Sequence, residues 1–133
     1  MPTDLLPPEA SRRVVETSRD IAGDRLRSVT YFTENDYEQL YLREDLARDA
    51  DLESFIDVEW HESTIIEESY GTSELGEHHY TVRVFENGFL LRVSGEHDGL
   101  FVTLDDLSMH TFEELGRTLD GLIREFPHSP VDG

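Results

Sequence analysis

The feature that most constrains the fold of this chain is the dipeptide Asn87-Gly88, which lies between two runs of alternating apolar and polar residues. Asn-Gly is the preferred pair for a two-residue type I′ turn, because both turn positions require a positive φ angle. The sequence therefore predicts an antiparallel hairpin that turns at this dipeptide. In that hairpin Arg83 lies opposite Arg92.

A second turn is predicted at Asp98-Gly99, and the strand that follows it places Asp105 opposite Arg92. Because side chains alternate along a strand, the two turns together assign every residue to one of two faces. The core face carries Tyr80, Val82, Val84, Phe89, Leu91, Val93, Leu100, Val102 and Leu104. The second face carries Thr81, Arg83, Phe85, Leu90, Arg92, Ser94, Phe101, Thr103 and Asp105.

The first part of the chain predicts a helix and then a hairpin. Apolar residues recur at helical spacing over 8–22, and Gly23 follows as a residue that ends a helix in a left-handed conformation. Segments 26–33 and 37–42 are rich in β-branched and aromatic residues, with a polar connection between them. This pattern predicts two antiparallel strands.

Helical spacing returns in the middle and at the end of the chain. A helix over 52–70 and a shorter one over 44–48 both fit the middle segment. In the last segment Thr111 and Glu114 match the capping box Thr-x-x-Glu, and the apolar stripe after them stops at Pro127.

Taken together, these elements predict an α+β fold with the order α-β-β-α-β-β-β-α and a single five-stranded antiparallel sheet. The 133 residues allow one domain, which we place at 9–126. We expect residues 1–8 to be a flexible lead-in and residues 127–133 to be a disordered tail.

Composition restricts the environment of the protein. The chain has no cysteine, which excludes disulfides, thiolate metal sites and a cysteine nucleophile. It also has no apolar run long enough to cross a bilayer and no signal-peptide pattern at its start, so we expect a cytoplasmic protein. Hydrophobic residues make up 37%, which is enough for a folded core.

The charge balance is extreme, with 30 Asp and Glu against 11 basic residues and a net charge of −19. All the basic residues are arginine. Such a chain repels nucleic acid and anionic membranes, and at low salt it attracts basic partners. Alternatively, the acidity is an adaptation to molar salt, where charge repulsion is screened within about 3 Å. The interspersed acids and the absence of lysine favour a halophilic organism.

Motifs for catalysis and cofactor binding are missing from the sequence. There is no Gly-x-Ser-x-Gly elbow and no glycine-rich phosphate loop before a helix, so we expect neither enzymatic activity nor a cofactor. Extending the predicted hairpin brings His78 opposite His97 and His79 opposite Glu96. A metal site formed by His78 and His97 with Glu74 or Glu77 is the alternative that this register leaves open.

The second face supplies the candidate interaction site. Like charges directly opposite each other destabilise a sheet unless an anion lies beside them. One interpretation is a ladder in which Asp105 neutralises Arg83 and Arg92, and the other is a site for an anion or a partner's carboxylate. Large apolar residues on the same face favour protein association. The candidate face consists of Arg83, Phe85, Leu90, Arg92, Phe101 and Asp105.

The order of elements across residues 8–126 resembles the Roadblock/LC7 and profilin-like architecture, with GAF and PAS sensor domains as looser relatives. The runs at 26–33, 37–46, 73–76 and 80–88 resemble a family of small acidic haloarchaeal proteins of unknown function. The Roadblock resemblance implies a homodimer that uses the candidate face or an edge strand. Neither resemblance supplies catalytic residues.

The sequence thus predicts a non-catalytic protein-binding or assembly module of a halophilic archaeon. The alternative is a stand-alone GAF- or PAS-like sensor of a small ligand, with a pocket near Tyr41, Phe55 and Trp60. An interior pocket would favour the sensor, and an exposed apolar face would favour the assembly module.

Overall fold

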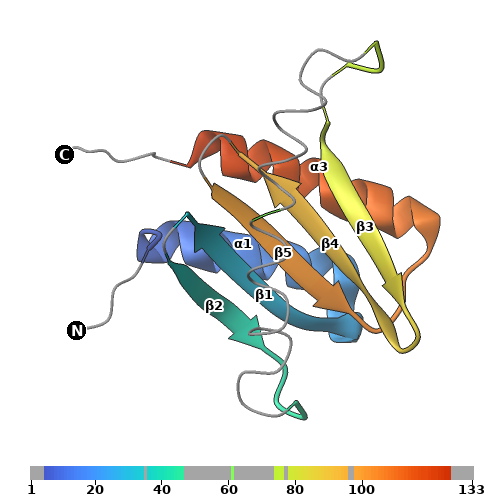
Figure 1. Ribbon diagram of the computed structural model, residues 1–133. Coiled ribbons are helices and arrows are strands. Elements are labelled where there is room, and N and C mark those ends of the chain that lie inside the picture. Colours follow the sequence, from blue (N-terminus) through green and yellow to red (C-terminus); the bar gives the residue numbers. More distant parts are fainter. Residues whose placement is uncertain are drawn as a thin grey trace, which may run out of the picture.

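A computed structural model describes residues 5–34, 36–46, 61, 74–76, 78–95 and 98–126. Figure 1 shows a sheet with two long helices on one side of it. The described elements are α1 (Pro8–Ala22), η1 (Gly23–Arg25), β1 (Leu26–Thr33), β2 (Tyr37–Leu42), β3 (Tyr80–Phe85), β4 (Gly88–Ser94), β5 (Asp98–Leu104) and α3 (Met109–Glu125).

The five strands form one antiparallel sheet in the order β2-β1-β5-β4-β3, as the sequence predicted for the fold class. The bounds of α1, β1 and β2 agree with the predicted segments, and Gly23 ends α1 with a φ of 63°. Of the helix predicted over 52–70, only His61 belongs to the described residues. Residues 44–46 form a turn. Within the described residues, no helix is both long and apolar enough to span a membrane.

The β3–β4 hairpin does not turn at Asn87-Gly88. Phe85 pairs with Gly88, so the two loop residues are Glu86 and Asn87. Gly88 is the first residue of β4, where a Cβ atom would lie only 2.5 Å from the carbonyl oxygen of Leu104. The glycine is therefore needed for close approach of two strands, and its φ is not positive as a type I′ turn requires.

In the observed register, Arg83 and Arg92 do not lie opposite each other. Thr81 pairs with Arg92 and Arg83 pairs with Leu90, so the predicted Arg83–Arg92 opposition is wrong. A shift of two residues leaves each side chain on its predicted face, because the side-chain period of a strand is two. The face assignments therefore survive the register error.

The second hairpin is displaced for a similar reason. Gly95 donates its N–H to the carbonyl of Asp98 at 2.8 Å, and Ser94 pairs with Gly99. Asp98 and Gly99 are thus strand residues, and Gly99 lies directly against the ring of Phe32. Arg92 consequently pairs with Phe101, and its predicted opposition to Asp105 is also wrong.

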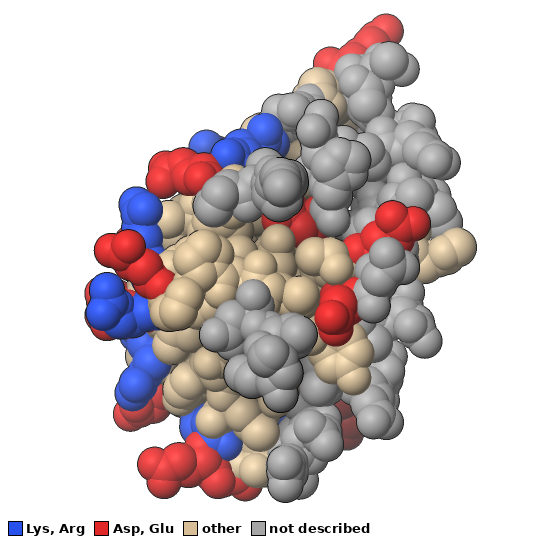
Figure 2. Space-filling view, turned by 90° about the vertical axis from the view of Figure 1, so that its left-hand side faces the viewer, with Lys and Arg blue, Asp and Glu red and all other residues tan. Residues whose placement is uncertain are grey.

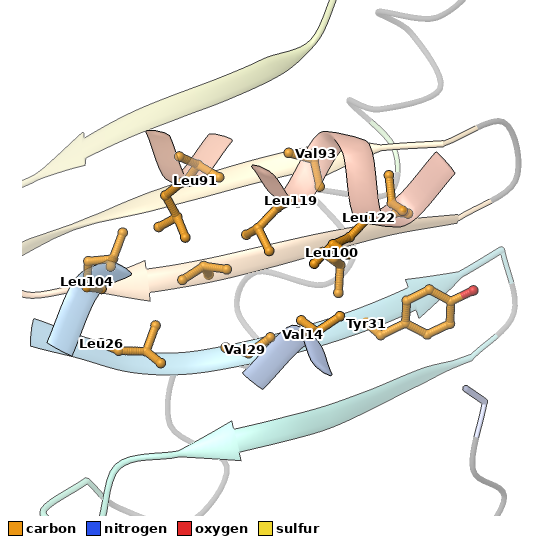
Figure 3. Packing of buried hydrophobic residues seen from close by; sticks show 14 of the residues in the cluster. Val14, Leu26, Val29, Tyr31, Leu91, Val93, Leu100, Leu104, Leu119 and Leu122 are labelled. Carbon is orange, nitrogen blue, oxygen red and sulfur yellow. The ribbon is translucent and has the colours of Figure 1, made fainter. Parts of the chain in front are cut away.

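The hydrophobic core lies between the core face and the two helices (Figure 3). Figure 3 shows Leu91, Val93 and Leu100 of the sheet directed toward Leu119 and Leu122 of α3. The predicted core-face residues belong to this cluster, fully or partly buried, with one exception. The exception is Val84, whose side chain at the end of β3 is 75% exposed.

The start of α3 differs from the predicted capping box. The helix begins at Met109, and the side chain of Ser108 accepts the N–H of Thr111 at 3.1 Å. Ser108 is therefore the N-cap residue, because its side chain supplies the oxygen that accepts a free backbone N–H of the first turn. Thr111, predicted as the cap, lies inside that turn. Further along, Gly116 allows the ring of Tyr80 to lie against α3, since a Cβ there would come within 2.7 Å of that ring.

Candidate functional site

The candidate face predicted from the sequence is divided by burial. Leu90, Arg92 and Phe101 have exposed fractions of 1% or less, whereas Phe85 is 45% exposed. Arg92 donates from Nη2 to Thr81 Oγ1 at 3.1 Å. Three of the six residues thus lie in the interior, Phe85 is exposed at the end of β3, and Arg83 and Asp105 are partly buried.

Asp105 lies away from Arg92, in a charged cluster at the end of β5. Arg43 binds it through two hydrogen bonds, Nη1 to Oδ2 at 2.6 Å and Nη2 to Oδ1 at 3.2 Å. Arg27 adds a contact at 3.6 Å, and Arg43 also pairs with Asp45 at 2.6 Å. The cluster therefore connects the chain after β2 to the start of the loop that leads into α3.

These contacts lower the pKa of two carboxylates in the cluster. The hydrogen bond from Arg43 lowers the pKa of Asp105 below its usual range, against the opposing effect of burial. The same guanidinium lowers the pKa of Asp45. Arg43 was missed by the sequence analysis, because its partner is 62 residues away and nothing local marks the pair.

Two buried polar pairs link β1 to β5. Ser28 and Thr103 share a hydrogen bond of 2.6 Å between their hydroxyl groups. Tyr31 donates its hydroxyl to Asp98 Oδ2, also at 2.6 Å. Burial raises the pKa of Tyr31, and the hydrogen bond to the Asp98 carboxylate raises it further, so the phenol stays protonated. These pairs hold strands together and have no exposed reacting group.

The β2 edge of the sheet is irregular and partly covered. The β1–β2 register shifts between Val29 and Thr30, which makes Leu40 a bulge. Next to it, Leu5 donates its N–H to Glu38 Oε1 at 2.9 Å, and Leu6 is 1% exposed. Two residues expected to be in a flexible lead-in thus contribute to the core, and one of them is hydrogen-bonded to a side chain of β2.

The β3 edge is regular and open within the described part of the chain. β3 pairs with β4 without a register shift, and it is the outermost strand of the sheet (Figure 1). Its sequence, Tyr-Thr-Val-Arg-Val-Phe, contains no acidic residue. Val84 and Phe85 are exposed at its end. An open, regular edge with apolar side chains is a template for strand pairing.

A hollow of about 340 Å³ lies beside the β3–β4 loop. Aromatic and aliphatic residues form much of it, and Arg27 is among the lining residues. The lining residues are Arg27, Phe85, Glu86, Asn87, Gly88, Phe89, Thr103 and Leu104. Its volume falls within the range of small-molecule sites, at the lower end.

The histidines do not gather in the described residues. His78 contacts Thr81 Oγ1 at 2.9 Å, and His79 contacts Asp120 Oδ2 of α3 at 3.0 Å. His97 and Glu77 of the predicted metal site lie outside the described residues. Among the residues that are described, no group of three potential ligands is close enough to hold a metal ion.

Charge is unevenly distributed over the chain. α1 exposes three arginines and three carboxylates, and Figure 2 shows both signs alternating along the left side of the view. In contrast, residues 44–77 contain twelve acids and one arginine. The acidic excess is therefore concentrated in this part of the sequence, and both the helical layer and β3 carry little of it.

The described part of the chain forms an α+β domain in which one antiparallel sheet carries two helices on one face. The chain belongs to the family described as a domain of unknown function (DUF7522), which matches residues 12–124. No curated protein matches the chain.

Two solved structures share the fold. The gliding protein MglB from Thermus thermophilus aligns with a TM-score of 0.65 at 12% identity, covering 92% of this chain and 95% of that one. A structure of MglB with a tetrameric arrangement aligns with a TM-score of 0.65 at 13% identity, covering 93% and 96%. At this identity the likeness establishes the fold alone.

Proposed function

We propose that the protein is a non-catalytic assembly module that forms a homodimer through the open edge of β3. The observation that carries this proposal is the contrast between the edges of the sheet. β2 is bulged, and its Glu38 side chain accepts a hydrogen bond from Leu5, whereas β3 is regular, free of acids and apolar at its end. The tetrameric arrangement of the similar MglB structure supports self-association of this fold.

Electrostatics also favours β3 as the contact surface. A chain with a net charge of −19 repels a second copy over most of its surface. Strand pairing along β3 brings no carboxylate of β3 against another, because this strand contains none. Paired strands additionally satisfy backbone N–H and C=O groups on both copies.

Light scattering after gel filtration in multimolar KCl tests the proposal. We expect a mass of twice 15.3 kDa. A strict monomer at high protein concentration would contradict it. We also propose a cytoplasm of high salt as the habitat, and we expect the melting temperature to rise as KCl increases into the molar range. A melting temperature that falls over that range would exclude this habitat.

The second candidate, a sensor of a small ligand, is favoured by the hollow beside the β3–β4 loop. It differs from the pocket expected near Tyr41, Phe55 and Trp60, of which the last two lie outside the described residues. Benzoate is a suitable probe, since the hollow combines aromatic side chains with an arginine. A melting temperature that does not change in millimolar benzoate would count against this site.

A further inference from the structure

We propose that the hollow beside the β3–β4 loop binds an aromatic cation, a ligand with a flat apolar ring and a positively charged head group, and that Glu86 recognises the charge. This inference rests on the second candidate function, which makes the hollow a ligand site. It adds the chemical class of the ligand and the residue that distinguishes this class from neutral and anionic rings.

The shape of the hollow suits a flat ring. Phe85, which is 45% exposed, pairs with Gly88 of the neighbouring strand, and both residues line the hollow. Directly opposite residues lie on the same face of a sheet with Cβ positions about 4.5–5.5 Å apart, so a side chain at position 88 would contact Phe85. The glycine supplies no such side chain. The ring of a ligand can take this place, as aromatic side chains do beside glycines on neighbouring strands.

The charged residues that line the hollow, Arg27 and Glu86, differ in whether they already have a partner. Arg27 Nη1 lies 3.6 Å from Asp105 Oδ1, so a ligand carboxylate would have to compete with Asp105 for this guanidinium. In contrast, Glu86 is exposed, and within the described part of the chain its carboxylate has no hydrogen bond or ion pair. A cationic head group therefore gains a partner at Glu86 without displacing another.

A cation held in this way is recognised by contact and not by the net charge of −19. In molar salt the Debye length is about 3 Å, so charges farther away contribute little. A charge-assisted hydrogen bond from an amidinium to a carboxylate is about 2.7–2.9 Å long, which is within that limit. Asn87 also lines the hollow, and its amide oxygen can accept a further N–H. The preference for a cation should therefore persist in concentrated KCl.

Three probes of nearly the same shape test the class of the ligand. Benzamidine, benzamide and benzoate share one ring and carry a positive, a neutral and a negative head group at neutral pH. Their dissociation constants are measured by isothermal titration calorimetry in multimolar KCl. We expect benzamidine to bind about two- to fivefold more tightly than benzamide, which is the range of an exposed ion pair, and benzoate to bind most weakly.

Two pairs of variants locate the interaction. Glu86→Gln should reduce the affinity for benzamidine to that for benzamide, because it removes the charge and keeps the shape of the side chain. Glu34→Gln, at an exposed position between β1 and β2, is the control and should keep the preference. Phe85→Ala should weaken the binding of all three probes, whereas Tyr37→Ala, which truncates a side chain of similar exposure on β2, should not. Circular dichroism checks that each variant keeps the fold.

The outcomes separate this inference from the proposed functions. If none of the probes binds, the hollow is not a ligand site, and the second candidate function fails together with this inference. If benzoate binds most tightly, or if all three probes bind equally, the ligand site stands and the cationic class is overturned. A preference for benzamidine that is unchanged in Glu86→Gln would overturn the role of Glu86. Self-association is tested separately, by light scattering.

Discussion

The two edge strands of this sheet, β2 and β3, differ in how regularly they pair and in what they expose to another strand. At β2, a bulge interrupts the pairing, and Leu5 donates its N–H to the side chain of Glu38, while Leu6 is buried in the core. At β3, the strand is regular and ends in Val84 and Phe85, both exposed. An unprotected edge invites another strand, so natural proteins usually block it. The contrast teaches that β2 departs from regular pairing whereas β3 does not, and this difference is the basis of the proposed pairing through β3.

The largest expected effect is on the free energy of unfolding, and it concerns Leu6, which precedes α1 and is buried in the core. Leu6→Ala should reduce the free energy of unfolding by about 2–5 kcal/mol, because it leaves a cavity at a side chain that is 1% exposed. Urea denaturation measures this loss. Leu75→Ala is the matched control, since Leu75 is 97% exposed and its truncation should change stability by less than about 0.5 kcal/mol. Equal effects of the two variants would contradict the role given to Leu6.

The second prediction concerns the hairpin that presents β3. Gly88→Ala should destabilise by about 1–3 kcal/mol, because the added methyl group collides with the carbonyl of Leu104. Gly121→Ala should change stability in the opposite direction. Its Cβ meets nothing within 4 Å in α3, so helix propensity should stabilise the protein by up to about 1 kcal/mol. The melting temperatures of the two variants are compared by thermal denaturation. An unchanged melting temperature for Gly88→Ala would show that β4 and β5 can move apart at this point without loss of stability.

The third prediction removes the attraction of the open edge. Val84→Glu should weaken dimerisation at least tenfold, which corresponds to about 1.4 kcal/mol, because it places a carboxylate without a partner at the contact, where it loses hydration. Stability of the monomer should change little, as Val84 is 75% exposed. Sedimentation equilibrium measures the dissociation constant. Tyr37→Glu on the β2 edge is the control, and an equal loss there would erase the difference between the edges.

The smallest effect concerns the cluster that holds the end of β2. The pKa of Asp105 is lowered in the folded state, so its carboxylate stabilises the fold above its unfolded pKa of about 3.9, and this contribution is lost as pH falls through the folded pKa. Asp105 is 41% exposed, so solvent screening limits the cost of Asp105→Asn to about 0.2–1 kcal/mol at pH 7.

Urea denaturation at pH 7 and at pH 2.5 checks this prediction. The difference between Asp105→Asn and the parent protein should shrink at the lower pH. Glu113→Gln, which removes an exposed partner of Arg117, serves as the control and should have a smaller effect at pH 7. A difference for Asp105→Asn that is unchanged at pH 2.5 would contradict the assigned cause.

Local signals predicted the elements well where the interactions that form them are local. Pro8 and Gly23 delimit α1, and two apolar runs correspond to β1 and β2. The cap of α3 was placed three residues late, because Ser108 and Thr111 both match a cap and only the backbone path decides between them. The predicted hairpin register was wrong for a related reason. A glycine such as Gly88 is suited either to a tight turn or to the close approach of two strands, and the local sequence does not distinguish these roles.

The residues of the candidate face lie at different depths in the structure. Phe85 is exposed on the expected strand, but Leu90, Arg92 and Phe101 are buried. Alternation along a strand tells which residues share a face, and it contains no information about whether that face is covered. Arg43 was not predicted at all, because an ion pair over 62 residues depends on the meeting of chain segments and leaves no local pattern.

By itself, the sequence determined the class of fold, the limits of several elements and the apolar face of each strand, because propensity and periodicity act over a few residues. It also determined the net charge of −19, because net charge follows from composition alone. The tertiary structure decided the register of both later hairpins, since the close contacts of Gly88 with Leu104 and of Gly99 with Phe32 exist only once β5 and β1 are in place. It likewise decided where Leu5 and Leu6 come to lie, because the bond from Leu5 to Glu38 and the burial of Leu6 depend on segments far apart in the chain.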